Sequence, residues 1–177
     1  DQGDAVVVWQ SPGEDGDGFG IFARRVAADG TPLGPEFQVN TRTVGDQRVP
    51  SVAMDADGDF LVAWQDGDDN LNPSSRVYAR RFNAAGVPLG DQFRVTDLTT
   101  GYEQSPLTAV DRDGNFVVAF NIQGQTPMGG FVGQRISSSG IPMGTLFQIS
   151  TGTDGGGGGG TVSFDRNGNL LAVWSPS

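Results

Sequence analysis

The chain has 177 residues, a formal net charge of −10, and neither Cys nor His. The missing Cys excludes disulfides and thiolate metal sites, and the missing His removes the commonest general base and transition-metal ligand. The negative charge argues against nucleic acid and anionic membranes as partners. No apolar run approaches the ~20 residues that span a bilayer, so we expect no membrane insertion. The chain opens on Asp1 without a visible signal peptide, which suggests a mature product or a piece of a longer protein.

Tandem repetition is the strongest pattern in the sequence. Four apolar runs each end in an aromatic residue, and the aromatic recurs about every 55 residues. Two further motifs keep the same order in each copy, a Pro-Leu-Gly or Pro-Met-Gly turn and a following Phe-x-Val or Phe-x-Ile segment. The four apolar runs are Ala5 to Trp9, Phe60 to Trp64, Phe116 to Phe120 and Leu170 to Trp174.

Each full copy divides into four predicted strands, which we name A to D in chain order. In the second copy they cover residues 51–55, 59–66, 76–83 and 91–96, with Gly-containing turns between A and B and between C and D. The chain then reads B-C-D, A-B-C-D, A-B-C-D, A-B. The predicted copies cover approximately residues 1–50, 51–106 and 107–160, with a partial copy at 161–177.

The B strands favour one architecture. The runs Ala5 to Trp9 and Phe116 to Phe120 are apolar at every position, which is typical of strands covered on both faces. A β-sandwich predicts more alternation, and a solenoid usually has shorter repeats. We therefore predict an all-β fold, a β-propeller-like array of four-stranded antiparallel blades. About three blades are too few for a closed ring, so either the array belongs to a longer chain or several copies assemble.

Residues 15–25, with the Pro-Leu-Gly motif at 32–34 and the Phe-Gln-Val-Asn segment at 37–40, resemble a repeat of large secreted bacterial proteins. Those proteins are adhesin-like or calcium-associated surface proteins, and their repeats look like propeller blades. The resemblance covers nearly the whole chain but is weaker in the third copy, where Gly129 to Phe131 replace the acidic loop. It implies an extracellular or cell-surface location, and it says little about activity.

The A–B turns are candidate calcium sites, because alternate carboxylates beside a Gly offer the hard oxygen ligands that Ca²⁺ prefers. The full calcium loop with a distant bidentate acid is missing, and Asp and Asn also suit tight hairpins without a metal. Both interpretations stay open, as they do for the acidic B–C loops at 14–18 and 66–70. The candidate ligands are Asp55, Asp57, Asp59, Asp111, Asp113 and Asp165.

Three other constellations have structural interpretations. Arg25, Arg81 and Arg135 recur once per copy and could converge on an anion, but we expect them to pair with acidic neighbours or to lie along a strand surface. The aromatic that ends each B strand is expected in the core between blades. The Gly155 to Gly160 run lacks the Lys and helix of a phosphate loop and is interpreted as a linker.

These observations predict a non-catalytic scaffold, structural or adhesive, on the bacterial surface or outside the cell. Its expected partners are a protein, a glycan, or further copies or blades of the same protein. The alternative is a fragment of a sialidase-like or glycoside-hydrolase propeller enzyme. For a sialidase, the only tyrosines are Tyr78 and Tyr102, and Tyr78 occupies a repeated strand position. For a glycoside hydrolase, acids are plentiful but no pair stands out.

Overall fold

The computed structural model describes residues 3–67, 75–124, 129–150 and 160–174, and within these ranges the secondary structure is entirely β. No helix in this part of the chain is long and apolar enough to cross a membrane. The strands form four antiparallel sheets, of three, four, four and two strands in chain order. The strands are β1 (Ala5–Pro12), β2 (Phe19–Val26) and β3 (Phe37–Gln38); β4 (Asp46–Met54), β5 (Phe60–Gly67), β6 (Arg76–Phe82) and β7 (Phe93–Arg94); β8 (Tyr102–Val110), β9 (Phe116–Gln123), β10 (Gly130–Ile136) and β11 (Pro142–Gln148); and β12 (Gly160–Phe164) and β13 (Leu170–Trp174).

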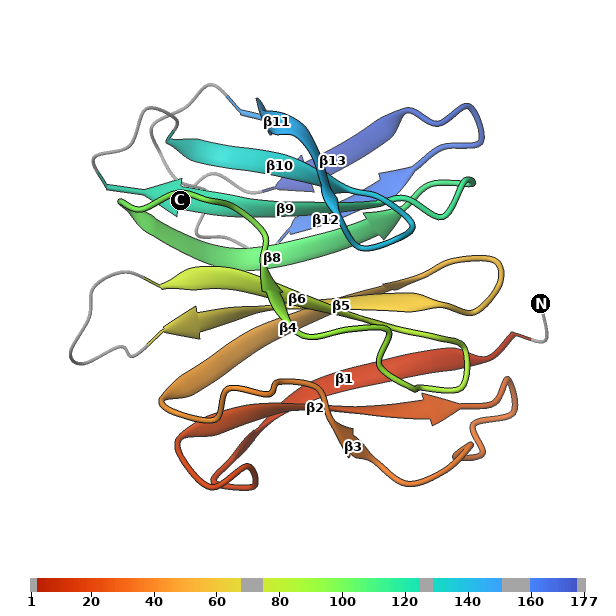
Figure 1. Ribbon diagram of the computed structural model, residues 1–177. Helices are drawn as coiled ribbons and strands as arrows, with labels where there is room; N and C mark the ends of the chain where they lie inside the picture. The colour runs from red at the N-terminus through yellow and green to blue at the C-terminus, as the bar shows by residue number, and fades with distance from the viewer. Residues whose placement is uncertain (1–2, 68–74, 125–128, 151–159, 175–177) are drawn as a thin grey trace.

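The four sheets stack face to face in chain order, from the β1–β3 sheet to the β12–β13 sheet (Figure 1). In each four-stranded sheet the strands follow one another in sequence order, as the predicted A-B-C-D blades require. The A strands lie along one side of the stack, where β4 contacts β8 and β8 contacts β12. The prediction of antiparallel four-stranded blades is therefore confirmed.

The core lies between the sheets, in three hydrophobic clusters. The central B strands contribute to two clusters at once, because successive side chains of a strand point to opposite faces. On β5, Phe60, Val62 and Trp64 pack towards the first sheet, while Leu61 and Ala63 pack towards the third. All five side chains are completely buried. An uninterrupted apolar run at this position is thus explained by coverage on both faces.

The terminal sheets depart from this prediction. Val7 of β1 is 50% exposed, and on β13 Leu171, Val173 and Trp174 are 52%, 65% and 38% exposed. Among the described residues no sheet lies against the outer face of β1, so Ala5 to Trp9 is covered on one face only, as an array of about three blades leaves its terminal faces open. The same holds for β13, so the predicted place of the terminal aromatics in the inter-blade core is only partly met.

The A strands start earlier than predicted. β4 begins at Asp46 rather than at residue 51, and it contains a β-bulge between Arg48 and Ser51. Val49 has a φ of 52°, and Ser105 at the same place in β8 has a φ of 53°. Each bulge residue precedes a Pro, which cannot donate a hydrogen bond to the ladder. A Gln of the preceding B strand stabilises each bulge: Gln10 Oε1 accepts the N–H of Val49 at 2.8 Å, and Gln65 Oε1 that of Ser105 at 3.5 Å.

The D strand of the second sheet is shorter than predicted. β7 contains only Phe93 and Arg94, whereas the sequence analysis expected residues 91–96. Hydrogen bonds between the sheet and irregular backbone replace a longer ladder. The N–H of Val95 donates to the carbonyl of Val77 at 2.9 Å, and the guanidinium of Arg80 donates through Nε to the carbonyl of Gly90 at 3.0 Å.

Candidate functional site

The candidate calcium turns have one geometry in three successive sheets. In each turn the first Asp uses Oδ1 to accept two backbone N–H groups, two and four residues further on. For Asp55 both distances are 3.0 Å, for Asp111 both are 2.9 Å, and for Asp165 both are 2.8 Å. A Gly at positive φ completes each turn, as Gly58 does at 87°. The first acid of each turn therefore has a structural role that requires no metal.

The carboxylates of these turns differ in their other contacts. Asp59 Oδ1 accepts the N–H of Ala84 at 2.9 Å, and its Oδ2 lies 3.4 Å from Nη2 of Arg81. Hydrogen bonds, first from the side chain of Asn169, hold the pKa of Asp165 below its usual range, so this exposed acid is ionised at neutral pH. In the described part of the chain no three acids lie close enough together to hold a metal ion. The two interpretations of Asp55, Asp57, Asp59, Asp111, Asp113 and Asp165, as plain turn residues or as calcium ligands, both stay predictions.

We expect chelation to leave the stability of the fold unchanged. Ca²⁺ takes six to eight oxygen ligands, and a turn whose first carboxylate already closes the backbone has few left to give. The measurement is the melting temperature with excess calcium and with EDTA. Because a ligand that binds only the folded state raises the melting temperature, a clear rise with calcium would contradict this expectation.

The repeated arginines lie in the C strands β2, β6 and β10 of three successive sheets. Arg81 pairs with Asp59, as expected, and its guanidinium carbon lies 5.8 Å from the ring centroid of Phe116 in the next sheet. Arg25 lines a hollow between the first two sheets, and Arg135 is exposed. The arginines one position earlier, Arg24 and Arg80, donate to the carbonyls of Gly34 and Gly90 at 3.0 Å and hold the C–D connections.

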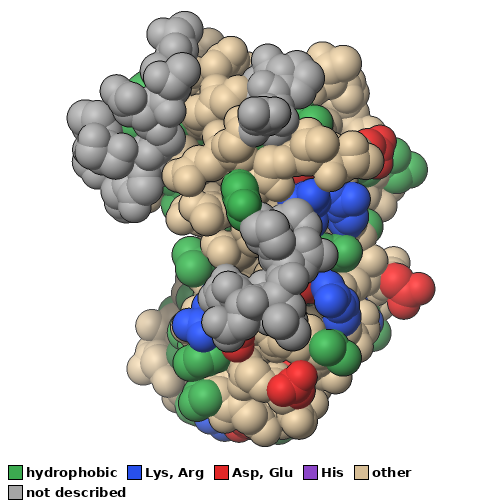
Figure 2. Space-filling view, turned by 90° about the vertical axis from the view of Figure 1, so that its left-hand side faces the viewer, with side chains coloured by type: hydrophobic (Ala, Val, Ile, Leu, Met, Phe, Trp, Pro, Cys, Tyr) green, Lys and Arg blue, Asp and Glu red, His purple; other side chains and the backbone are tan. Residues whose placement is uncertain are grey.

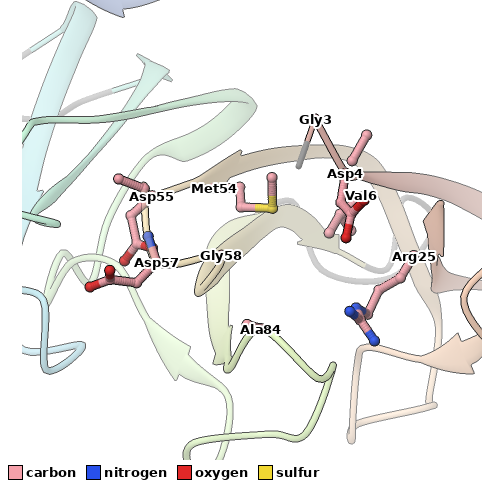
Figure 3. A pocket seen from close by; sticks show the side chains of 11 residues that line it. Gly3, Asp4, Val6, Arg25, Met54, Asp55, Asp57, Gly58 and Ala84 are labelled. Atoms are coloured by element: carbon pink, nitrogen blue, oxygen red, sulfur yellow. The ribbon is translucent and has the colours of Figure 1, made fainter. Parts of the chain in front are cut away.

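The hollow between the first two sheets has a volume of about 170 Å³. Figure 3 shows Asp4, Val6 and Arg25 on one side, and Asp55, Asp57 and Ala84 on the other. The lining contains one guanidinium and three carboxylates, a set that suits a small polar ligand. The volume is below the roughly 300 Å³ at which typical small-molecule sites begin.

A second hollow, of about 350 Å³, lies where the loop after β7 faces β11. Its polar side chains are Arg94, Thr96, Asp97, Gln134 and Thr145. On the face drawn in Figure 2, acidic and basic side chains are interspersed among scattered hydrophobic ones, and no patch of a single sign dominates what is visible. Of these two hollows, the second lies at the lower end of the roughly 300–1,000 Å³ range of small-molecule sites, and the first lies below it.

Sequence reasoning missed a pair of buried polar residues where each D strand leads into the next A strand. Glu103 is completely buried, and its carboxylate accepts the N–H of Val77 at 2.8 Å and the hydroxyl of Thr96 at 2.6 Å. Gln47 holds the same place one copy earlier, is also completely buried, and accepts from Nδ2 of Asn40 at 2.9 Å. Gln47 and Glu103 occupy matching positions in the repeat, and this match is the sequence signal that could have identified them.

Burial raises the pKa of Glu103, although its hydrogen bonds from Thr96 and Val77 and the nearby guanidinium of Arg94 act in the opposite direction. Burial also raises the pKa of Asp66 against the opposing charge of Arg42, whose Nη1 lies 3.0 Å from Asp66 Oδ1. Both carboxylates connect neighbouring copies of the repeat. Neither reaches a hollow described above, so their positions indicate structural roles.

No protein-family model and no curated protein matches this sequence. Solved structures do share its fold. The GH43 endo-arabinanase of Bacillus licheniformis superposes with a TM-score of 0.59 at 12% identity, over 100% of this chain and 69% of that one. The α-L-arabinofuranosidase of Lactobacillus brevis superposes with a TM-score of 0.51 at 13% identity, over 97% of this chain and 60% of that one. The chain therefore has a β-propeller-type fold, whose sheets do not close into a ring.

Proposed function

We propose that this chain is a non-catalytic scaffold of a secreted or surface-attached bacterial protein, which binds a protein or glycan partner through its loops. The observation that carries the proposal is that the acids in the repeated turns, and those where neighbouring copies join, make contacts within the chain. Asp55, Asp111 and Asp165 each close a hairpin turn through two backbone hydrogen bonds. Glu103 and Asp66 are buried where neighbouring copies of the repeat join.

The shape of the surface supports the same proposal. The hollow lined by Arg25 and three acids is too small for most organic ligands, and the second hollow is only at the lower end of the usual range. The repeated loops and turns instead offer an extended row of polar groups. A row of this kind suits a long partner, such as a polysaccharide chain, that contacts several copies of the repeat at once.

A test that separates binding from catalysis is affinity electrophoresis in gels cast with a panel of polysaccharides, arabinan included, followed by product analysis. We expect at least one polysaccharide to retard the chain, with no new reducing ends after prolonged incubation. A suitable control is the same chain after heat denaturation, which keeps composition and charge and loses the fold. Release of oligosaccharides by the folded chain would overturn the proposal.

A second candidate function is catalytic, and the fold comparisons favour it. Both neighbours are named as enzymes that act on arabinan or arabinofuranosides, so a carbohydrate-active enzyme is the specific alternative. The chain spans 60–69% of the length of these two neighbours. Under this alternative, the catalytic acid pair of the glycosidase would include at least one acid that neither closes a turn nor joins two copies of the repeat. Hydrolysis of arabinan that survives replacement of Asp55 and Asp111 by Asn would support it.

A further inference from the structure

We infer that the hollow between the loop after β7 and β11 is a binding site for a carboxamide group, the group that ends a glutamine side chain. The inference deepens the proposed function and rests on it, because it names a chemical group by which a protein or glycan partner is recognised. The hollow lies between two complete four-stranded sheets in the interior of the array. Further sheets stacked on either end of the array would therefore leave it open.

The equivalent junction one copy earlier shows which groups belong at this place. There Gln92 reaches from the second sheet to the connection between the first and second sheets. Its Oε1 accepts the N–H and the hydroxyl of Thr41 at 2.7 and 2.9 Å, and the N–H of Arg42 at 3.1 Å. Nη1 of Arg80 donates to the carbonyl of Val39 at 2.9 Å. A carboxamide oxygen and a guanidinium thus join the first two sheets.

Between the second and third sheets both of these joining side chains are replaced. Leu146 takes the place of Gln92 in the repeat and lines the hollow, and its side chain cannot accept a hydrogen bond. Gln134 takes the place of Arg80, and its Nε2 donates to two carbonyls of its own sheet, both at 3.0 Å. Neither side chain therefore repeats the contacts that join the first two sheets.

The backbone on the other side of the hollow is affected by both replacements. Asp97 takes the place of Thr41, and Val95 takes the place of Val39. Both residues line the hollow. The side chain now opposite Asp97 offers no acceptor to its N–H, and the side chain now opposite Val95 has its amide N–H groups engaged elsewhere. A ligand that accepts from Asp97 and donates to Val95 would restore the pattern of the earlier junction.

Two side chains of the hollow have further hydrogen-bonding capacity. Nε of Arg94 is buried and has no hydrogen-bond partner among the described residues. Gln134 is only 4% exposed, and because its amide nitrogen makes the two backbone contacts, its carbonyl oxygen is left as an acceptor. Leaving a buried polar group without a partner costs free energy, so a ligand that supplies partners here is favoured.

The mixture of donors and acceptors selects a neutral ligand group. The donors are Nε of Arg94 and the N–H of Asp97, and the acceptors include the carbonyl of Val95 and the carboxylate of Asp97. A carboxylate ligand would supply acceptors alone and would be repelled by Asp97, whereas an ammonium would supply donors alone and would be repelled by Arg94. A carboxamide carries an acceptor oxygen and a donor nitrogen on one planar group.

The rest of the lining suits a short hydrocarbon stem that carries this group. The hollow has a volume of about 350 Å³, within the range of small-molecule sites. Its apolar side chains are Val95, Leu98, Pro142 and Leu146. A group of this shape is present on a glutamine side chain of a partner protein, and its amide is also present on an acetamido sugar.

The experiment uses propionamide, which is the glutamine side chain without its backbone, and the nitrogen-15-labelled chain. Backbone amide signals are followed by nuclear magnetic resonance as propionamide is added. We expect saturable shifts centred on Asp97 and Leu98, with a dissociation constant on the order of millimolar for so small a ligand. Propionate and propylamine are the matched probes, since they have nearly the same shape and only acceptors or only donors. Each should bind at least about tenfold more weakly.

A variant that restores the side chain of the earlier copy provides a second test. Leu146→Gln places a carboxamide of the chain itself where Gln92 has one, so we expect it to occupy the hollow and to weaken propionamide binding by about tenfold or more. The control is Leu89→Gln, which adds the same group at a position that is 49% exposed and does not line the hollow. It should bind propionamide like the unmodified chain. Circular dichroism establishes that both variants fold.

Two larger probes distinguish the source of the group. One is a tripeptide, N-acetyl-Ala-Gln-Ala N-methylamide, with the same peptide containing Glu as its control. The other is N-acetylglucosamine, with glucose as its control. Tighter binding of the peptide than of propionamide assigns the group to a protein partner, and tighter binding of the sugar assigns it to a glycan. If propionamide binds and neither larger probe does, the hollow takes an adventitious additive only and the inference fails.

Three further results would overturn the inference. The first is a titration with propionamide that gives no saturable shifts at Asp97 and Leu98. The second is equal binding of propionamide and propionate. The third is unchanged binding in a folded Leu146→Gln variant. Retardation of the chain by a polysaccharide does not depend on any of these results, and release of oligosaccharides would overturn the proposed function whatever propionamide does, so the two failures are distinguishable.

Discussion

Replacing Trp64 with Ala should lower the free energy of unfolding by about 3–5 kcal/mol, the range for a large aromatic removed from a packed core. Trp64 is completely buried between the first two sheets, and its ring stacks on Tyr78 with 6.4 Å between centroids. Truncation would leave a cavity at the centre of the cluster shared by these sheets. The change in the free energy of unfolding is measured by urea denaturation, with far-ultraviolet circular dichroism as the signal because it does not depend on tryptophan fluorescence.

Two matched variants test the reason for this effect. Trp174 ends the equivalent strand but is 38% exposed, so Trp174→Ala should cost less than half as much as Trp64→Ala. Trp64→Phe copies Phe120 of the third sheet and removes an indole N–H that is buried without a hydrogen-bond partner among the described residues. We expect this variant to lie within about 1.5 kcal/mol of the unmodified chain. Equal losses for Trp64→Ala and Trp174→Ala would contradict the assignment of interior and terminal blades.

Replacing Glu103 with Ala should lower the free energy of unfolding by about 1–3 kcal/mol, because it leaves the buried N–H of Val77 without an acceptor. Glu103→Gln should cost much less at neutral pH. The Gln side chain keeps an oxygen for Val77, its amide can donate to Thr96, and it removes a charge that burial opposes. The structure contains a precedent in Gln47, which holds the same place one copy earlier.

The raised pKa of Glu103 also predicts how stability depends on pH. In the unfolded chain the carboxyl loses its proton near its ordinary pKa of 4.5, whereas the folded chain holds that proton to higher pH. The folded state therefore binds more protons in this window, and stability falls as pH rises from the ordinary pKa through the raised one. Asp66 acts in the same direction, while the lowered pKa values of Asp29 and Asp165 act in the opposite one.

The Glu103→Gln variant isolates this contribution. Urea midpoints measured between pH 4 and pH 8 should decline less with rising pH in Glu103→Gln than in the unmodified chain. The Glu103→Ala variant loses the same titration but should be less stable than Glu103→Gln at every pH. Identical pH profiles for Glu103→Gln and the unmodified chain would show that the buried carboxyl titrates normally.

The features that could be predicted from the sequence are those that recur in each copy and those that depend on neighbouring residues. The B strands followed from unbroken apolar runs, and the turn at Asp55 followed from its Asp and Gly spacing, because both depend on residues close together in the chain. The bulges at Val49 and Ser105 could not be predicted. Each depends on a backbone N–H that donates to the side-chain oxygen of Gln10 or Gln65 in the preceding sheet, and no local sequence pattern indicates that contact.

The weaker third copy has a physical explanation that only the structure supplies. Gly133 replaces the Ala found at this place in the two earlier copies, and a Cβ there would lie 2.4 Å from Cζ of Phe147. The ring of Phe147 packs against the backbone of β10, which has no side chain at Gly133, and β11 is longer than the equivalent D strands.

The buried polar residues Gln47 and Glu103 were not predicted from the sequence either. Acids on a chain of net charge −10 are expected at the surface, and only the stacking of sheets shows that Glu103 is enclosed.

The most direct test of the central claim, that each copy of the repeat is one sheet in an open stack, is amide hydrogen exchange resolved along the chain. It should be measured at a protein concentration at which light scattering gives the mass of a monomer. We predict the slowest exchange in β5 and β9, which are central in their sheets and covered on both faces, and clearly faster exchange in β1 and β13. Protection of β1 and β13 equal to that of β5 would contradict the open stack and indicate a closed or differently packed structure.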